Sequence, residues 1–169
     1  ASSSASIEFT SGIDSTYDVY QFEFVNIHAA TDGAEFQFNL STDGGSNYNI
    51  TKTTTFFQAF HNEADSATSL NYETGQDLAQ STSDQVLITN MGTDNDQSCS
   101  GTLQLFNPSS TTYVKHFISN INNYLNSDYS VEQFVAGYGN TTSAVDAIKF
   151  VMSSGNLDSG TIKMYGISA

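Results

Sequence analysis

Three histidines are the first candidates for metal binding or general acid–base chemistry in this sequence. His28, His61 and His116 lie far apart, and only His61 has a close acidic neighbour, in the string His61-Asn62-Glu63. A zinc protease needs the spacing H-E-x-x-H on one helical face, with the glutamate as base, and that spacing does not occur. We therefore interpret each histidine as structural or solvated.

Serine and carboxylate chemistry also lack a matching pattern. A nucleophilic serine on a strained turn follows G-x-S-x-G, whereas the nearest strings, at residues 44–46 and 153–155, are typical of ordinary turns. A glycan hydrolase needs two carboxylates about 5–10 Å apart in a groove. The 18 acidic residues make a chance pair easy, but the chain has no tryptophan to serve as a sugar platform. The sequence predicts no catalytic residue and a protein that is not an enzyme, and a glycan hydrolase is the weakest alternative.

Calcium is the best cofactor candidate, because loop carboxylates and amides offer hard oxygen ligands. Asp94, Asn95 and Asp96 form one such group, and Asp43-Gly44-Gly45 forms a second. Neither completes the D-x-[DN]-x-[DN]-G series with its terminal glutamate. We therefore expect no metal and no cofactor, and leave open only whether a calcium ion binds near Asp94 and Asp96. Cys99 is the only cysteine, and we interpret it as a small semi-buried side chain, with a reactive thiol as the alternative.

The charge balance excludes two classes of partner. The chain carries 18 acidic residues against four lysines and no arginine, which is a formal net charge of −14. A nucleic-acid-binding protein needs a basic stripe to displace counterions from phosphates. An anionic membrane surface would repel this chain for the same reason. No apolar run approaches the roughly 18 residues that a membrane-spanning helix requires. We therefore expect neither nucleic acid nor membrane as a partner.

The stretch 101–123 predicts the central hairpin of an all-β domain. Leu103 and Leu105 alternate with outward-facing residues, which is the period of a half-buried strand. Residues 107–110, Asn-Pro-Ser-Ser, have the composition of a tight turn. The returning strand is expected from Thr111 onward, because this segment is rich in β-branched and aromatic residues.

The same alternation predicts further strands, at residues 5–10, 18–27, 34–41, 48–60, 85–89, 130–139, 147–152 and 161–167. In the second of them, Ile27 is expected to point the same way as Val25 and opposite to Phe22 and Phe24. In the third, Asn39 is expected to point outward between the inward-facing Phe38 and Leu40. Residues 61–82 are polar without a sustained period, and they predict a long connection between sheets with a candidate helical turn near residues 62–67.

About nine to eleven short strands separated by Gly, Asn, Asp and Ser turns predict an antiparallel, jelly-roll-like β-sandwich. A chain of 169 residues can bury enough apolar surface for one domain without metal or disulfide help. We therefore expect a single β-sandwich domain over residues 1–169. The Ser-rich segment 1–6 is a candidate extended arm.

Six segments carry a family resemblance: F-T-S-G-I-D-S-T-Y (9–17), F-V-N-I-H-A-A-T-D (24–32), A-F-H-N-E-A-D (59–65), L-F-N-P-S-S-T-T-Y-V-K-H-F (105–117), V-A-G-Y-G-N-T-T-S-A (135–144) and M-S-S-G-N-L-D-S-G-T-I-K-M-Y-G-I (152–167). On these segments the chain resembles a family of short virion proteins predicted from marine tailed-phage genomes and viral metagenomes. The resemblance implies a structural protein of the particle rather than an enzyme, and it carries no catalytic or ligand residues. The last segment is also similar to the final hairpin of jelly-roll modules in viral fibres and lectin-like domains.

The resemblance leads us to expect a capsid decoration (cement) subunit or a tail-fibre domain, exposed on the surface of the virion. The expected partners are other copies of the chain, in a homotrimer, and the major capsid protein or tail components. The alternative is a carbohydrate-binding, lectin-like module that recognises a host surface glycan. Its site would require exposed tyrosines clustered in one concavity, with Tyr48, Tyr72 and Tyr129 as candidates.

Overall fold

The structure, a computed structural model, describes residues 1–168 and confirms the predicted all-β class. Every pair of strands is antiparallel, and the described residues include no helix, hence none that is long and apolar enough to cross a membrane. The strands are β1 (Ser6–Phe9), β2 (Val19–Ala29), β3 (Ala34–Ser41), β4 (Lys52–Asn62), β5 (Thr68–Tyr72), β6 (Gln85–Met91), β7 (Cys99–Phe106), β8 (Lys115–Leu125), β9 (Tyr129–Gly139), β10 (Ala147–Met152) and β11 (Leu157–Ile167).

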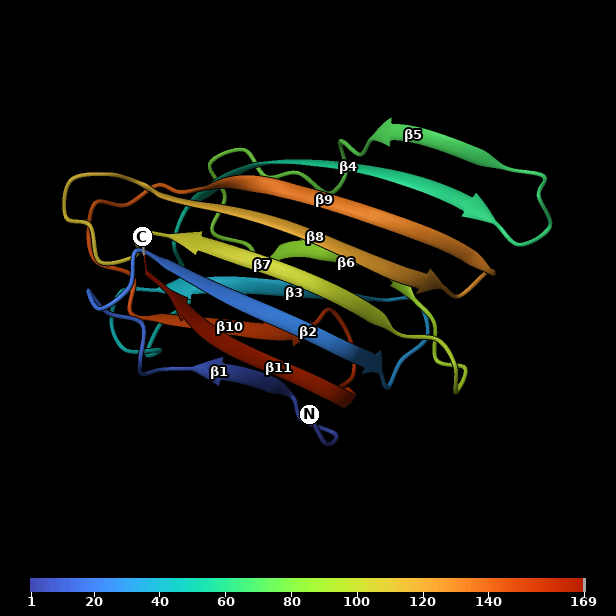
Figure 1. Ribbon diagram of the computed structural model, residues 1–169, viewed down its shortest axis with the longest axis horizontal. Coiled ribbons are helices and arrows are strands. Elements are labelled where there is room, and N and C mark those ends of the chain that lie inside the picture. The colour runs from blue at the N-terminus through green and yellow to red at the C-terminus, as the bar shows by residue number, and fades with distance from the viewer. Residues whose placement is uncertain (169) are drawn as a thin grey trace.

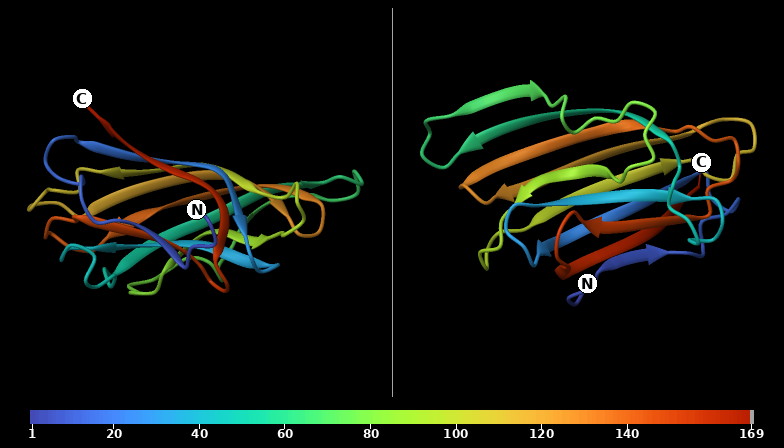
Figure 2. Two further views of the ribbon diagram at one scale, coloured as in Figure 1. Left: turned by 90° about the horizontal axis from the view of Figure 1, so that it is seen from below. Right: turned by 180° about the vertical axis from the view of Figure 1, so that it is seen from behind.

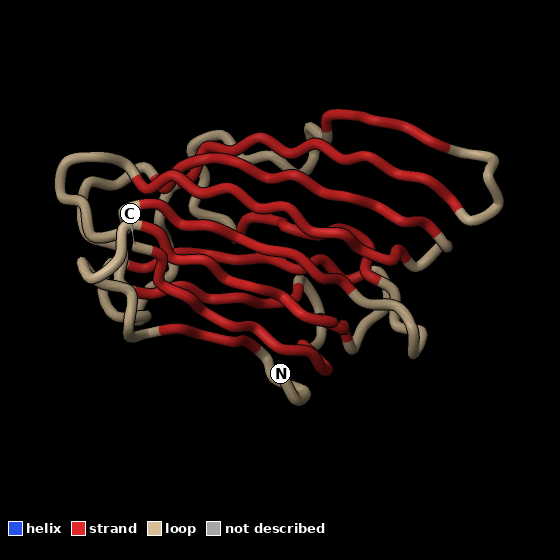
Figure 3. Tube along the Cα trace, viewed as in Figure 1, coloured by secondary structure: helices blue, strands red, loops and turns tan. Residues whose placement is uncertain are grey.

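The strands lie in two layers, which Figure 1 shows from the front and Figure 2 from below and from behind. The larger sheet has the order β5-β4-β9-β8-β7-β2-β11, and the smaller sheet has the order β1-β10-β3-β6. Loops connect the strands at both ends of the layers (Figure 3). Aromatic rings of the two sheets meet between the layers, as Phe24 of β2 does with Phe36 of β3 at a centroid distance of 5.2 Å. The arrangement is that of a β-sandwich.

Phe150 of β10 lies at the centre of the core. Its ring centroid is 5.4 Å from that of Phe22, 5.2 Å from that of Phe24 and 5.9 Å from that of Phe36. All four side chains are buried. Because Phe22 and Phe24 belong to the larger sheet and the other two to the smaller one, this aromatic cluster holds the layers together.

The two sheets meet along one edge at a single residue pair. β6 pairs with β8 only through Met91 and Leu125. Near the opposite edge, an isolated bridge joins Ser4 to Leu157 at the start of β11. The Ser-rich N-terminal segment therefore runs along β11, where the Ala1 ammonium donates to the Gly160 backbone oxygen at 2.6 Å.

The predicted central hairpin is confirmed in position but not in its turn. β8 is the middle strand of the larger sheet, between β7 and β9, and Leu103 and Leu105 are buried as predicted. The returning strand begins at Lys115 rather than at Thr111, so residues 107–114 form a loop instead of a tight turn.

The buried Lys115 explains this loop. Its ammonium donates to the backbone oxygens of Ser110 at 2.6 Å, Tyr113 at 2.7 Å and Thr141 at 3.3 Å. Because these carbonyls accept from the Lys115 ammonium, they do not pair with a neighbouring strand. These charge-assisted hydrogen bonds outweigh the β propensity of residues 111–114. Burial lowers the pKa of Lys115.

The prediction for residues 61–82 is partly wrong. This segment contains the edge strand β5, which pairs with β4. The candidate helical turn near residues 62–67 is the end of β4 followed by the hairpin turn of residues 63–67. The Asn62 side chain stabilises the turn, since its Oδ1 accepts from the backbone N–H groups of Ser66 and Ala67 at 2.9 Å each. β4 itself begins at Lys52, four residues later than predicted.

The orientation predicted for Ile27 is also wrong, and Asn39, predicted to point outward, is not exposed. Ile27 is buried, because Asn26 has a φ of 49° and the pairing of β2 with β7 shifts register between Phe24 and Ile27. This bulge reverses the face on which the following residues point. Asn39 is buried as well, because β3 continues past the start of β6 and residues 81–84 cover it.

Candidate functional site

The outer face of the larger sheet carries a row of apolar side chains over β5, β4, β9 and β8. Alternation places Phe57, Phe134 and Ile118 on this face, while their neighbours along the strands point into the core. Tyr72 pairs with Phe57 across the β4–β5 ladder. We define the aromatic patch by six residues: Phe57, Tyr72, Ile118, Phe134, Ala136 and Tyr138.

The patch is exposed and ordered by cross-strand contacts. Ile118 is 53% exposed, Tyr72 is 48% exposed and Phe57 is 39% exposed. The Phe57 and Phe134 rings stack, with centroids 4.8 Å apart and planes inclined by 7°. Stacking of this kind pre-arranges apolar area that could contact a partner at a low cost in side-chain entropy.

A shallow hollow of about 450 Å³ lies within the patch, between β4, β8 and β9. His116, Ile118 and Tyr138 line it, and the His116 and Tyr138 rings meet edge to face at 6.1 Å. Gly137 lies in its floor, where a Cβ atom would come within 2.5 Å of the Thr53 backbone oxygen. A larger residue there would push β4 and β9 apart.

The strands of the patch carry few ionised groups on their outer face, and the Asp77 carboxylate accepts from the Tyr72 hydroxyl at the β5 edge. Among the outward-facing residues of β5, β4, β9, β8 and β7, Glu132 is the single carboxylate, and the lysines of these strands, Lys52 and Lys115, point inward and are buried. In a chain with 18 acidic residues, this is a marked local depletion of charge.

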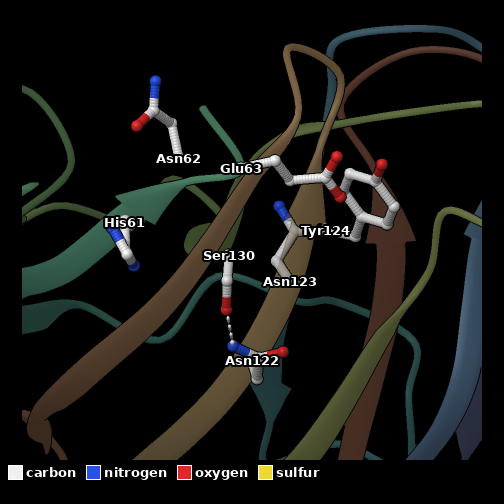
Figure 4. A pocket seen from close by; sticks show the side chains of 7 residues that line it. All are labelled: His61, Asn62, Glu63, Asn122, Asn123, Tyr124 and Ser130. Atoms are coloured by element: carbon white, nitrogen blue, oxygen red, sulfur yellow. Dashed lines mark hydrogen bonds between the residues drawn. The ribbon is translucent and has the colours of Figure 1, made fainter. Parts of the chain in front are cut away.

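A polar pocket of about 410 Å³ lies where the β4–β5 and β8–β9 hairpins end (Figure 4). The backbone N–H of Glu63 donates to the Asp128 oxygen at 3.1 Å, which joins the two turns. On the floor, the Asn122 amide donates to Ser130 Oγ at 3.1 Å. The seven lining residues are His61, Asn62, Glu63, Asn122, Asn123, Tyr124 and Ser130.

The electrostatics of this pocket centre on Tyr124. Figure 4 shows the Glu63 carboxylate beside the Tyr124 ring, and this carboxylate raises the pKa of Tyr124 to about 12. The Tyr124 hydroxyl donates to Asp128 Oδ1 at 3.3 Å. Asn123 is fully buried, and its Oδ1 has no hydrogen-bond partner. The pocket therefore offers a phenol and a carboxylate, which suit a ligand rich in hydroxyl groups.

The three tyrosines proposed for a sugar site do not come together. The Tyr48 hydroxyl donates to Glu8 at 3.1 Å, and the Tyr72 hydroxyl donates to Asp77 at 2.6 Å. Tyr129 packs edge to face against Phe60 at 5.6 Å. Of the three, only Tyr72 belongs to the patch.

The predicted acidic loops are organised by their own hydrogen bonds. The Asp94 backbone N–H donates to Gln97 Oε1 at 3.0 Å. The Asp43 carboxylate accepts from Asn47 and from Ser41, and these bonds lower the pKa of Asp43 to about 2. Over residues 1–168, no group of three or more His, Cys, Asp or Glu side chains is placed to hold a metal ion.

The histidines and Cys99 have separate surroundings. His28 lies 3.6 Å from Asp158, and His61 lies 3.0 Å from Asp65. Cys99 is buried, and burial raises the pKa of its thiol, so the interpretation as a small core residue is supported.

Apart from Tyr72, the residues of the patch were not singled out by sequence reasoning. β4 carries Phe56 and Phe57 in succession, of which the first enters the core and the second faces solvent. The sequence feature that could have indicated the patch is a strand with apolar residues on both of its faces. Comparison with known proteins adds no assignment, because no protein family, curated protein or solved structure matches the chain.

Proposed function

We propose that the protein is a non-enzymatic structural subunit exposed on the surface of a phage particle, with a jelly-roll-like sandwich, and that it assembles with copies of itself through the aromatic patch. It would serve as a capsid decoration subunit or a tail-fibre domain. The observation that carries the self-assembly is the exposed, uncharged patch on a chain of net charge −14. The particle location rests on the family resemblance.

The net charge of the chain and the low charge of the aromatic patch favour a second copy of the chain as the partner that covers the patch. Two chains of charge −14 repel each other, so contact between them requires a face without carboxylates. The centres of protein–protein interfaces are depleted of charged residues and enriched in aromatic ones. The patch has both properties, and its neighbour Glu132 would lie at the rim. A homotrimer is the proposed assembly.

Mass measurement in solution tests the assembly. We expect light scattering coupled to size exclusion to give three times the chain mass, and expect the double variant Phe57→Ser/Phe134→Ser to be a folded monomer. Tyr113→Ser is the matched control, since Tyr113 is 69% exposed and lies outside the patch. A monomeric wild-type protein would overturn self-assembly. A cryo-electron-microscopy map of the particle without density for the chain would overturn the virion location.

Glycan recognition is the second candidate function, and the polar pocket beside Tyr124 is the observation that favours it. A glycan array would show binding by the wild type that is lost in Asn122→Ala, whose side chain lines the pocket. Binding that persists in this variant would place the sugar elsewhere.

A further inference from the structure

Lys52 and Asn39 meet in the interior, at the edge of the sandwich. Lys52 is the first residue of β4 in the larger sheet, and Asn39 lies in β3 of the smaller sheet. Both are buried, with 0% and 1% of their surface exposed. The Lys52 Nζ donates to Asn39 Oδ1 at 2.6 Å and to the Ile50 backbone oxygen at 2.9 Å. An amine is thus in contact with a carboxamide away from solvent.

The Asn39 amide is held by hydrogen bonds on both of its sides. Its Oδ1 also accepts from the backbone N–H of Leu40 at 2.9 Å. Its Nδ2 donates to Asp84 Oδ1 at 2.7 Å and to the Thr82 backbone oxygen at 3.0 Å. This pattern fixes which amide atom faces Lys52, because only an oxygen can accept from an ammonium and a backbone N–H.

One segment positions both reacting side chains. The backbones of Lys52 and Ser81 exchange two hydrogen bonds, at 2.7 and 3.0 Å, and Asp84 follows three residues later. Asp84 is itself oriented by the Lys149 ammonium at 3.4 Å. The segment that anchors the start of β4 therefore also carries the carboxylate that contacts the amide nitrogen.

Burial changes the protonation of Lys52. Desolvation lowers the pKa of Lys52 to about 8, with Asp84 acting in the opposite direction and Lys149 in the same direction. About a tenth of the amine is then neutral at pH 7, far more than for a solvated lysine. A desolvated neutral lysine is a nucleophile.

We propose that Lys52 and Asn39 form an intramolecular isopeptide bond, assisted by Asp84. The neutral Nζ attacks Asn39 Cγ, and a bond forms between these two atoms. A proton passes from the attacking nitrogen to Nδ2, and the bond from Cγ to Nδ2 breaks. One molecule of ammonia leaves, and a secondary amide joins β3 to β4. The reaction consumes no oxidant, metal or cofactor, and the atoms balance.

Each neighbour has a role in this step. The Leu40 N–H stabilises the negative charge that develops on Oδ1 in the tetrahedral intermediate. The Asp84 carboxylate accepts a hydrogen bond from Nδ2 at 2.7 Å and so orients the leaving nitrogen. The contact within the folded core replaces a bimolecular encounter, which lowers the entropic part of the barrier to amide exchange.

Lys115 shows that burial of a lysine is not sufficient for this arrangement. It is as fully buried as Lys52, yet its Nζ contacts three backbone carbonyls and no side-chain amide. Lys52, by contrast, contacts the carboxamide of Asn39, and that carboxamide contacts the carboxylate of Asp84. The inference concerns the chain alone and does not rest on the proposed assembly or location.

Intact-mass spectrometry of the wild-type protein, purified folded and incubated at pH 8, is the first test. We expect a mass lower than that of the sequence by one ammonia. The variants Lys52→Met, Asn39→Ala and Asp84→Ala should keep the full mass, and Lys163→Met, at an exposed lysine of β11, should still lose ammonia. A wild-type protein with the full mass after incubation would overturn the proposal.

Peptide mapping distinguishes the bond from a succinimide at Asn39, which also releases ammonia. Cleavage before aspartate separates residues 32–42 from residues 43–64, because Asp43 lies between the two reacting residues. We expect these two peptides to remain joined, and expect trypsin to fail after Lys52. Separate peptides together with normal cleavage after Lys52 would overturn the proposal even if ammonia is lost. The wild-type measurements stand even if a variant does not fold.

Discussion

Phe57 and Phe134 stack almost in parallel across β4 and β9, with ring centroids 4.8 Å apart, on the solvent side of the larger sheet. The pair belongs to neither the core nor a turn, and it is fixed only by the antiparallel register of the two strands. Its contribution to the isolated chain can therefore be separated from its contribution to assembly.

A double-mutant cycle measures that contribution. We expect Phe57→Ala and Phe134→Ala to couple by about 0.5–1.5 kcal/mol in the free energy of unfolding, as aromatic pairs do beyond their buried area. The coupling free energy is measured by urea unfolding at protein concentrations below those at which the chain associates. A coupling near zero would mean that the two rings pack independently.

Phe150→Ala should be among the most destabilising substitutions in the chain. The ring contacts Phe22, Phe24 and Phe36 between the layers, so its removal leaves a cavity that rigid neighbours cannot fill. We expect a loss of about 3–5 kcal/mol in unfolding free energy, against less than about 0.5 kcal/mol for the exposed Tyr113→Ala. Equal effects of the two changes would contradict the described core.

The Asp43 turn should weaken in acid. Hydrogen bonds from Asn47 and Ser41 lower the pKa of Asp43 from 3.8 to about 2 in the folded protein. A carboxyl group whose pKa is depressed by folding stabilises the fold above its unfolded pKa, and this stabilisation is lost as pH falls through the folded value. Between about pH 4 and 2, we expect stability to fall less in Asp43→Asn than in the wild type. An NMR titration that places the pKa of Asp43 near 4 would contradict the expectation.

Lys52 should also make stability rise with pH, in the alkaline range, wherever its amine is free. Folding lowers the pKa of this lysine from 10.5 to about 8, so the unfolded chain binds the proton more tightly, and stability rises with pH between these values. We expect Asp84→Ala, which keeps the free amine, to gain roughly 1 kcal/mol per pH unit between about pH 8 and 10 relative to Lys52→Met. Parallel curves for the two variants would show that Lys52 does not titrate in this range.

Alternation predicted the parts of the fold that follow a strict period of two. Leu103 and Leu105 enter the core, and the core-facing side of β3 was identified through Phe36 and Phe38. The bulge at Asn26 was not predictable, because it depends on a single residue with positive φ. β5 was missed because it is a short edge strand whose residues are mostly exposed, and such a strand lacks a buried face to produce a period.

The interaction surfaces were harder to predict than the strands. Phe57 follows Phe56, so only the register of β4 against β9 decides which ring faces solvent. The Lys52–Asn39 contact depends on residues 81–84, which cover Asn39 and pair with Lys52. Because residues 81–84 arrange this contact, neither the sequence around Asn39 nor the sequence around Lys52 shows a periodic pattern that indicates it.

The site at which β3 and β4 meet also determines how the fold would respond to tension. Residues 40–51 connect Asn39 to Lys52, and these twelve residues would reach about 40 Å when fully stretched. With the amide bond in place, a pulling force passes directly from β3 to β4 and this connection carries no load. The extended length of the chain would shorten by that amount, and the exposed loop could be cut by a protease without separating the two strands.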